Sequence, residues 1–138
     1  MKKVTSKVGT IIAYDRSGDG PPIILVNGAF SHRAINSAAQ DMIALLAPQF
    51  TVISYDRRGR GDSTDTTAYA VEREVEDLHV LIDEVLVIAG EKSEPFMHNA
   101  AKAIADTLPN ARSYTLQGQD HDVAAEALAP VLQQFFAG

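Results

Sequence analysis

The chain has 138 residues, no cysteine and a formal net charge of -6 at pH 7. Its length suits one domain with its own core, and the lack of cysteine excludes disulfides, thiolate catalysis and cysteine zinc sites. The acidic balance disfavours nucleic-acid binding, and no apolar run could span a bilayer. We therefore expect a single cytoplasmic domain over residues 1–138, with no metal, cofactor, membrane or nucleic-acid partner.

The first elements are a predicted hairpin and a buried strand. Val4–Val8 and Thr10–Tyr14 flank Gly9 and favour strands joined by a tight turn. Pro22–Val26 is apolar without alternation, which is typical of a strand covered on both faces, so we expect it to be the central strand of a mostly parallel sheet. The glycine in Asn27–Phe30 then allows a tight turn at the carboxyl edge of the sheet, where α/β proteins bind ligands.

Helices and strands alternate through the middle of the chain. The predicted elements are helices over Arg33–Ala47 and Ala70–Glu84 and strands over Thr51–Tyr55 and Val85–Ala89. The carboxylates of the second helix form a solvated face. That helix meets the next strand with essentially no connecting turn, whereas such loops ordinarily take a few residues. A segment is therefore missing at this junction.

The remaining elements complete an α/β pattern. Ser93 as an N-cap and Pro95 in the first turn predict a helix, and Ser113–Leu116 predicts the last strand. Pro130 breaks the helical pattern that starts at Val123, so we expect a short turn and then a terminal helix from about Pro130. Strands alternating with helices after a hairpin define an α/β protein with helices on both faces of its sheet.

A basic loop, Asp56–Ser63 (DRRGRGDS), follows the Thr51–Tyr55 strand. It is expected at the same sheet edge as Asn27–Phe30, because both segments follow parallel strands. Its amides and guanidinium groups could hold a carboxylate or a phosphate. A turn stabilised by internal salt bridges is the interpretation that we favour.

Four motifs in this order resemble the α/β-hydrolase family: LVNGAF and YDRRGRGDS after two strands, VLVIAGE before a helix, and GQDHD after the final strand. The resemblance covers nearly all of the chain. It implies that Asn27–Phe30 is the family's oxyanion loop, with Asn27 and Gly28 where His-Gly is more usual and the Ala29 amide directed at a substrate oxygen. It also implies that His121 occupies the position of the catalytic histidine.

The chain departs from the family at the nucleophile. No G-x-S-x-G motif occurs anywhere in the sequence, and its place would lie between the acidic helix and VLVIAG. The elbow strand, its helix, the cap and the strand after the cap are thus all predicted to be deleted. At the usual position of the acidic triad member, Glu91 or Glu94 could serve, and Ser93 stands where Asp is common.

Two functions remain open. The first, which we favour, is an inactive hydrolase derivative that acts as a binding or scaffold protein, with a small-molecule ligand in the residual cleft. The alternative is a minimal hydrolase of small esters, with Ser31 as a nonstandard nucleophile beside His121. For Ser31, helix capping is the favoured role, and Ser63 is favoured as a turn residue.

Three structural expectations follow from the deletion. The strand Val85–Ala89 should pair directly with Ile23–Val26. The loops Asn27–Phe30, Asp56–Ser63 and Asp120–Asp122 should meet at one edge of the sheet. Apolar surface left uncovered should be buried in a homodimer, either simple or swapped across the junction before Val85.

Overall fold

The computed structural model describes residues 1–81, 85–107, 110–120 and 123–137. The chain divides into two compact units, Met1–Asp83 and Glu84–Gly138. The single domain over residues 1–138 stays a prediction. None of the helices in the described part of the chain has the length and apolar character of a membrane span.

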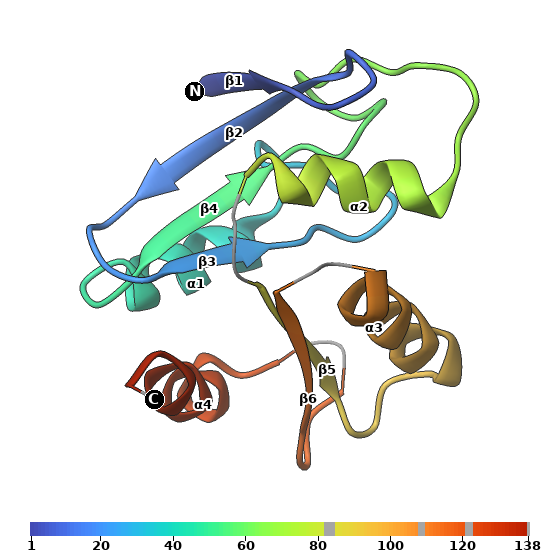
Figure 1. Ribbon diagram of the computed structural model, residues 1–138. Helices are drawn as coiled ribbons and strands as arrows, with labels where there is room; N and C mark the ends of the chain where they lie inside the picture. Colours follow the sequence, from blue (N-terminus) through green and yellow to red (C-terminus); the bar gives the residue numbers. More distant parts are fainter. Residues whose placement is uncertain (82–84, 108–109, 121–122, 138) are drawn as a thin grey trace. The chain divides into compact units, whose positions relative to one another are not determined.

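The first unit contains a four-stranded sheet (Figure 1). Its strands, in spatial order, are β1 (Lys2–Thr5), β2 (Ile11–Ser17), β4 (Thr51–Tyr55) and β3 (Pro22–Leu25). The antiparallel pairing of β1 with β2 confirms the predicted hairpin, and β3 lies parallel to β4. The two loops that follow β3 and β4 therefore leave the sheet at the same edge.

The central position belongs to β4, and all five of its residues are buried. Its outer neighbour β3 pairs with β4 alone and forms an edge of the sheet. Within this unit β4 and not β3 has a neighbour on both sides, because an unbroken apolar run reports covered side chains and not the number of hydrogen-bonded neighbours. The predicted pairing of β3 with the strand at Val85–Ala89 would join the two units, and it stays a prediction.

Two helices cover the first sheet on opposite faces, with α2 drawn in front of β4 and α1 behind it (Figure 1). Helix α1 spans Ser37–Leu46 and not Arg33–Ala47, since the Asn36 side chain accepts from the Ala39 amide and caps the helix there. Its buried Leu46 faces the core.

Helix α2 spans Val71–His79 and buries Val75 and Leu78. It ends before Glu84, so residues 80–84 separate it from the next strand. The predicted extension of this helix to Glu84 is therefore wrong, and the junction itself, at residues 82–84, lies outside the described residues. The dimer, simple or swapped across this junction, stays a prediction.

The second unit is a β-α-β arrangement followed by a helix. It consists of β5 (Val85–Gly90), α3 (Pro95–Thr107), β6 (Ala111–Leu116) and α4 (Ala125–Ala137). Strands β5 and β6 form a parallel two-stranded sheet. The α/β class is confirmed, and so is the first-turn position of Pro95.

Helix α4 continues through Pro130, so the predicted break there is wrong. A proline within a helix lacks the N–H that would reach the carbonyl four residues earlier, here that of Glu126 in the first turn, and its ring crowds the same carbonyl. Leu128 and Leu132, on either side of the proline, are both buried. Burial of this apolar face outweighs the loss of one hydrogen bond.

Candidate functional site

The loop after β3 is anchored by a buried asparagine. The Asn27 side chain donates from Nδ2 to the Tyr55 carbonyl at 3.1 Å and accepts at Oδ1 from Asn36 Nδ2 at 2.7 Å. With both ends of its amide occupied, Asn27 ties the end of β3 to the end of β4 and to the cap of α1. Its buried side chain fixes the base of the loop and is not presented to a ligand.

The next three residues, Gly28, Ala29 and Phe30, form an exposed turn closed by the Ser31 amide, which donates to the Gly28 carbonyl at 3.1 Å. Gly28 is not among the glycines with positive φ, and a Cβ there would meet nothing within 4 Å. Contrary to expectation, the turn does not require glycine. The absence of a side chain at Gly28 leaves open space instead. Within the described residues, the amides of Ala29 and Phe30 donate to no protein acceptor.

A buried arginine organises the chain beneath this loop. The Arg33 guanidinium pairs with Asp15, with Asp56 at 3.1 Å and with Asp62 at 3.0 Å. Burial alone would raise the pKa of Asp56, but hydrogen bonds from the Asp62 and Arg33 amides and the Arg33 guanidinium hold it below its usual range. The network joins β2, β4 and both loops, and it occupies the segment that was predicted to begin a helix at Arg33.

The basic loop after β4 is largely a salt-bridged turn, as favoured from the sequence. Arg57 forms a bidentate pair with Glu74 of α2, at 3.1 and 2.9 Å. Arg58 forms a bidentate pair with the fully buried Asp77, with both contacts at 2.8 Å. These two arginines hold α2 against the end of β4, and they are not available to a ligand.

The third arginine of the turn, Arg60, has a different environment. Its Nε donates to the Ala29 carbonyl at 2.9 Å and its Nη1 donates to the Gly59 carbonyl at 3.0 Å. The turn brings the two loops together as predicted for Asn27–Phe30 and Asp56–Ser63. Gly61 has φ of 49°, and a Cβ on it would lie 2.3 Å from Asp56 Oδ2, so this position requires glycine.

The two candidate serines have different surroundings. The Ser63 hydroxyl donates to the Asp56 carbonyl at 2.7 Å and accepts from the Ala13 amide at 2.9 Å, which confirms a turn residue. Ser31 is half-buried in the loop, and its hydroxyl has no hydrogen bond among the described residues. Helix capping by Ser31 is wrong, because Asn36 caps α1.

The predicted histidine His121, together with Asp122, lies outside the described residues, so its role stays a prediction. The part of its loop that is described, up to Asp120, lies beside the loop after β5. The Glu91 amide donates to the Leu116 carbonyl at 2.9 Å, and the Glu91 carboxylate accepts from the Gly118 amide at 2.9 Å. The candidate acid thus lies at the base of the loop that carries the candidate histidine, with one carboxylate oxygen already bound.

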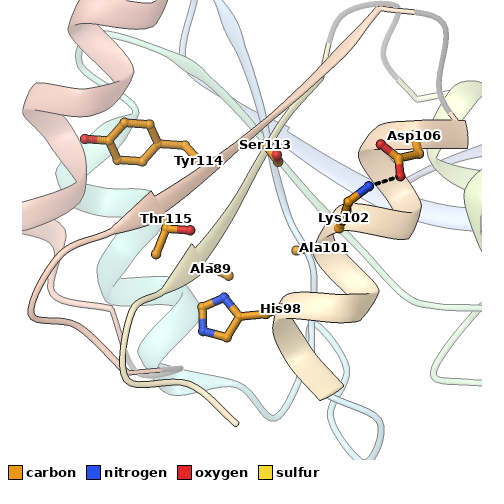
Figure 2. A pocket seen from close by; sticks show the side chains of 8 residues that line it. All are labelled: Ala89, His98, Ala101, Lys102, Asp106, Ser113, Tyr114 and Thr115. Atoms are coloured by element: carbon orange, nitrogen blue, oxygen red, sulfur yellow. Dashed lines mark hydrogen bonds and ion pairs between the residues drawn. The ribbon is translucent and has the colours of Figure 1, made fainter. Parts of the chain in front are cut away.

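The second unit also has a shallow hollow of about 370 Å³ between α3 and β6 (Figure 2). The residues that line it are Ala89, His98, Ala101, Lys102, Asp106, Ser113, Tyr114 and Thr115. The alanines on β5 and α3 leave space, and His98 is half-buried there with Nε2 at 3.3 Å from the Glu91 carbonyl. The sequence does not predict this hollow, which exists only once α3 packs on the strands.

No family model and no curated protein matches the chain. Solved structures do match, and together with the fold described above they define the class: the chain has a truncated α/β-hydrolase fold.

An α/β hydrolase from Sphaerobacter thermophilus DSM 20745 is similar over 98% of this chain and 100% of that one, with 28% identity and a TM-score of 0.66. The bottromycin epimerase BotH, in complex with bottromycin A2, is 26% identical over 83% of this chain, with a TM-score of 0.62. A bromoperoxidase from Bacillus anthracis, at 20% identity and a TM-score of 0.61, shares the fold alone. The chain spans 47% of the epimerase and 44% of the bromoperoxidase.

Proposed function

We propose that the protein binds a small molecule at the carboxyl edge of β3 and β4 without hydrolysing it. The observation that carries the proposal is the pair of unengaged amides, Ala29 and Phe30, beside the open space at Gly28. Such donors can bind a ligand oxygen whether or not a nucleophile is present. The sequence contains no G-x-S-x-G motif to supply that nucleophile.

The similarity to an epimerase supports a function other than hydrolysis. That protein has a related fold, binds bottromycin A2 and is named for a different reaction. A fold of this class is therefore compatible with ligand binding without ester cleavage. We place the protein in the cytoplasm as part of the same proposal, since its sequence has no cysteine to depend on an oxidising compartment.

The alternative function is hydrolysis of small esters with Ser31 as the nucleophile and His121 as the base. It is favoured by the unengaged hydroxyl of Ser31, on the loop that carries the free amides. A serine needs an adjacent base to become a nucleophile, so this function depends on His121 reaching Ser31.

An activated-ester assay and a fluorophosphonate probe separate these functions. We expect p-nitrophenyl acetate turnover and probe labelling of the wild type to equal those of Ser31→Ala and His121→Ala. Labelling of Ser31 that is lost in His121→Ala would contradict the proposal and support the minimal hydrolase. Binding itself is tested by Gly28→Ala, which fits the backbone but fills the open space and should weaken any ligand seated on the loop.

We also propose that a second copy of the chain covers the edge of β3. The opposite edge strand, β1, carries Lys2 and Lys3, and charges of this kind discourage edge-to-edge pairing. The edge at β3 has the sequence PIIL, with no charge. The Thr51 amide donates to the Pro21 carbonyl, so by alternation the backbone of Ile24 faces outward. Two copies related by a twofold axis could pair there.

Light scattering tests this dimer. At micromolar concentration we expect about twice the chain mass of 14.9 kDa for the wild type. Ile24→Lys should be monomeric, whereas Thr5→Lys on the opposite edge should remain dimeric, with thermal melts to show that both variants fold. Inserting glycines after Glu84 should leave the mass unchanged, because pairing at the edge of β3 does not depend on that junction. A monomeric wild type would contradict the proposal.

A further inference from the structure

In the described part of the chain, all arginines in the loops that follow β3 and β4 except Arg60 pair with a carboxylate. Arg33, Arg57 and Arg58 each pair with at least one carboxylate. The carboxylates they use are those of Asp15, Asp56, Asp62, Glu74 and Asp77. Among the described residues, Arg60 is the arginine of this loop with no carboxylate partner.

Arg60 is nevertheless held in place. Its Nε and Nη1 donate to the carbonyls of Ala29 and Gly59, which uses two of the five N–H groups of a guanidinium. The N–H groups that remain include both on Nη2. A planar guanidinium with adjacent free donors suits two parallel hydrogen bonds to one carboxylate. Because two carbonyls already fix the side chain, less conformational entropy is lost on binding.

The loop that Arg60 contacts also presents exposed apolar side chains. Phe30 is 95% exposed, Val26 56% and Ile35 62%. Single exposed apolar residues are common, but these three come from one loop and Phe30 directly follows the residue whose carbonyl Arg60 binds. A fixed cation and an exposed aromatic ring therefore lie on the same short segment.

We propose that Arg60 and the exposed turn of Gly28, Ala29 and Phe30 bind a small monocarboxylate with an apolar body. The carboxylate accepts from Arg60 and from the free amides of Ala29 and Phe30, and the apolar body contacts Phe30 and Val26. A single cation in a chain of net charge -6 suits a monoanion better than a phosphate dianion. This inference rests on the proposed binding function and names the ligand class of the same site.

Octanoate and its neutral counterpart octanamide are suitable probes, followed by ¹H–¹⁵N NMR titration of the full chain. In the wild type we expect octanoate to shift the Ala29 and Phe30 amides and to bind about 10-fold more tightly than octanamide, since hydrogen bonds to a charged group are the stronger ones. Arg60→Gln should weaken octanoate about 10-fold and leave octanamide unchanged. Phe30→Ala should weaken both probes about equally, by roughly 5-fold.

The matched control is Arg16→Gln on β2, which removes the same charge from another exposed arginine. We expect octanoate affinity in this variant to stay within about twofold of the wild type. Equal binding of octanoate and octanamide, equal effects of Arg60→Gln and Arg16→Gln, or no octanoate-induced shift at the loop would each overturn the inference. The proposed function fails separately, through turnover of the activated ester that depends on His121.

Discussion

The two units of this chain differ in how their polar and apolar groups are buried. Among the described residues, eleven of the fourteen buried apolar side chains belong to the first unit. The first unit also buries a bidentate ion pair and the Arg33 network. In the second unit α3 has no buried residue, and four consecutive residues of β6 are exposed.

This difference shows which unit holds its side chains more firmly. In the first unit β4 has a paired strand on each side, and all five of its residues are buried. The second unit has two strands packed against α3, and four consecutive residues of β6 are exposed. We therefore place the binding site on the first unit, where the supporting side chains are fixed.

The largest effect is expected from the ion pair that holds α2 in the first unit. Arg58→Ala leaves the Asp77 carboxylate buried without its partner, since the two side chains are 1% and 0% exposed. We expect a loss of about 3–5 kcal/mol in the free energy of unfolding, measured in urea. The double variant Arg58→Met with Asp77→Leu should recover most of that loss. A loss below about 1 kcal/mol for the single variant would contradict this account of the buried pair.

Core truncations of equal chemistry compare the two units directly. Leu78→Ala in α2 and Leu132→Ala in α4 each remove a buried leucine. We expect about 3 kcal/mol for Leu78 and about 2 kcal/mol for Leu132, because the more open second unit can collapse around the smaller side chain. Hydrogen exchange provides the local measurement: Leu132→Ala should speed exchange in β6 and leave β4 protected. Equal loss of protection in β4 would show that the units unfold together.

Acid should act on the first unit through Asp56. Its pKa in the folded state lies below the ordinary value of 3.8, so its contribution is present above that pH and is lost as the pH falls. We expect Asp56→Asn to cost about 1–2 kcal/mol at pH 7 and progressively less toward pH 3. Urea midpoints between pH 3 and pH 7 measure this.

Asp15 provides the comparison for the acid experiment. A hydrogen bond from the N-terminal ammonium lowers its pKa, so the sign is the same, but its side chain is half-exposed. Asp15→Asn should therefore show a smaller pH dependence, screened by salt. A difference between wild type and Asp56→Asn that does not change with pH would contradict the linkage.

The smallest effect is expected from an exposed ion pair in the second unit. Lys102 and Asp106 lie one turn apart on α3, with side chains 73% and 63% exposed. Lys102→Ala should change the free energy of unfolding by less than about 0.5 kcal/mol. Urea unfolding at low and high salt checks this, and a larger change would mean that the hollow beside α3 is better shielded from water than its exposure indicates.

The sequence predicted strand positions better than strand neighbours. The bounds of Thr51–Tyr55 were correct, because a continuous β-branched and aromatic run in a short window has few other solutions. The position of β3 at the end of the first unit's sheet was not predictable from its own residues, since the apolar sequence PIIL is compatible with one paired strand or with two. Pairing is a property of the whole sheet and not of one strand's residues.

The predicted start of the first helix was wrong because two side chains could have capped it. Ser31 and Asn36 are both good N-cap residues, and the sequence alone does not rank them. The ion pairs of Arg33 hold the intervening segment in a turn, so Asn36 prevails. The lack of a carboxylate partner for Arg60 among the described residues was equally unpredictable from the sequence. It depends on Arg57 and Arg58 pairing with carboxylates 17 and 19 residues away.

The backbone conformation at Gly61 and the carboxylate beside it limit which residues this position can accept. Any side chain at position 61 would need a left-handed backbone and would collide with the Asp56 carboxylate, on which both Arg33 and the Asp62 amide depend. A saturation library at position 61 should therefore retain glycine alone under selection for folding. The same library at Gly28 should retain small residues as well, and lose them only when selection is applied for the ligand.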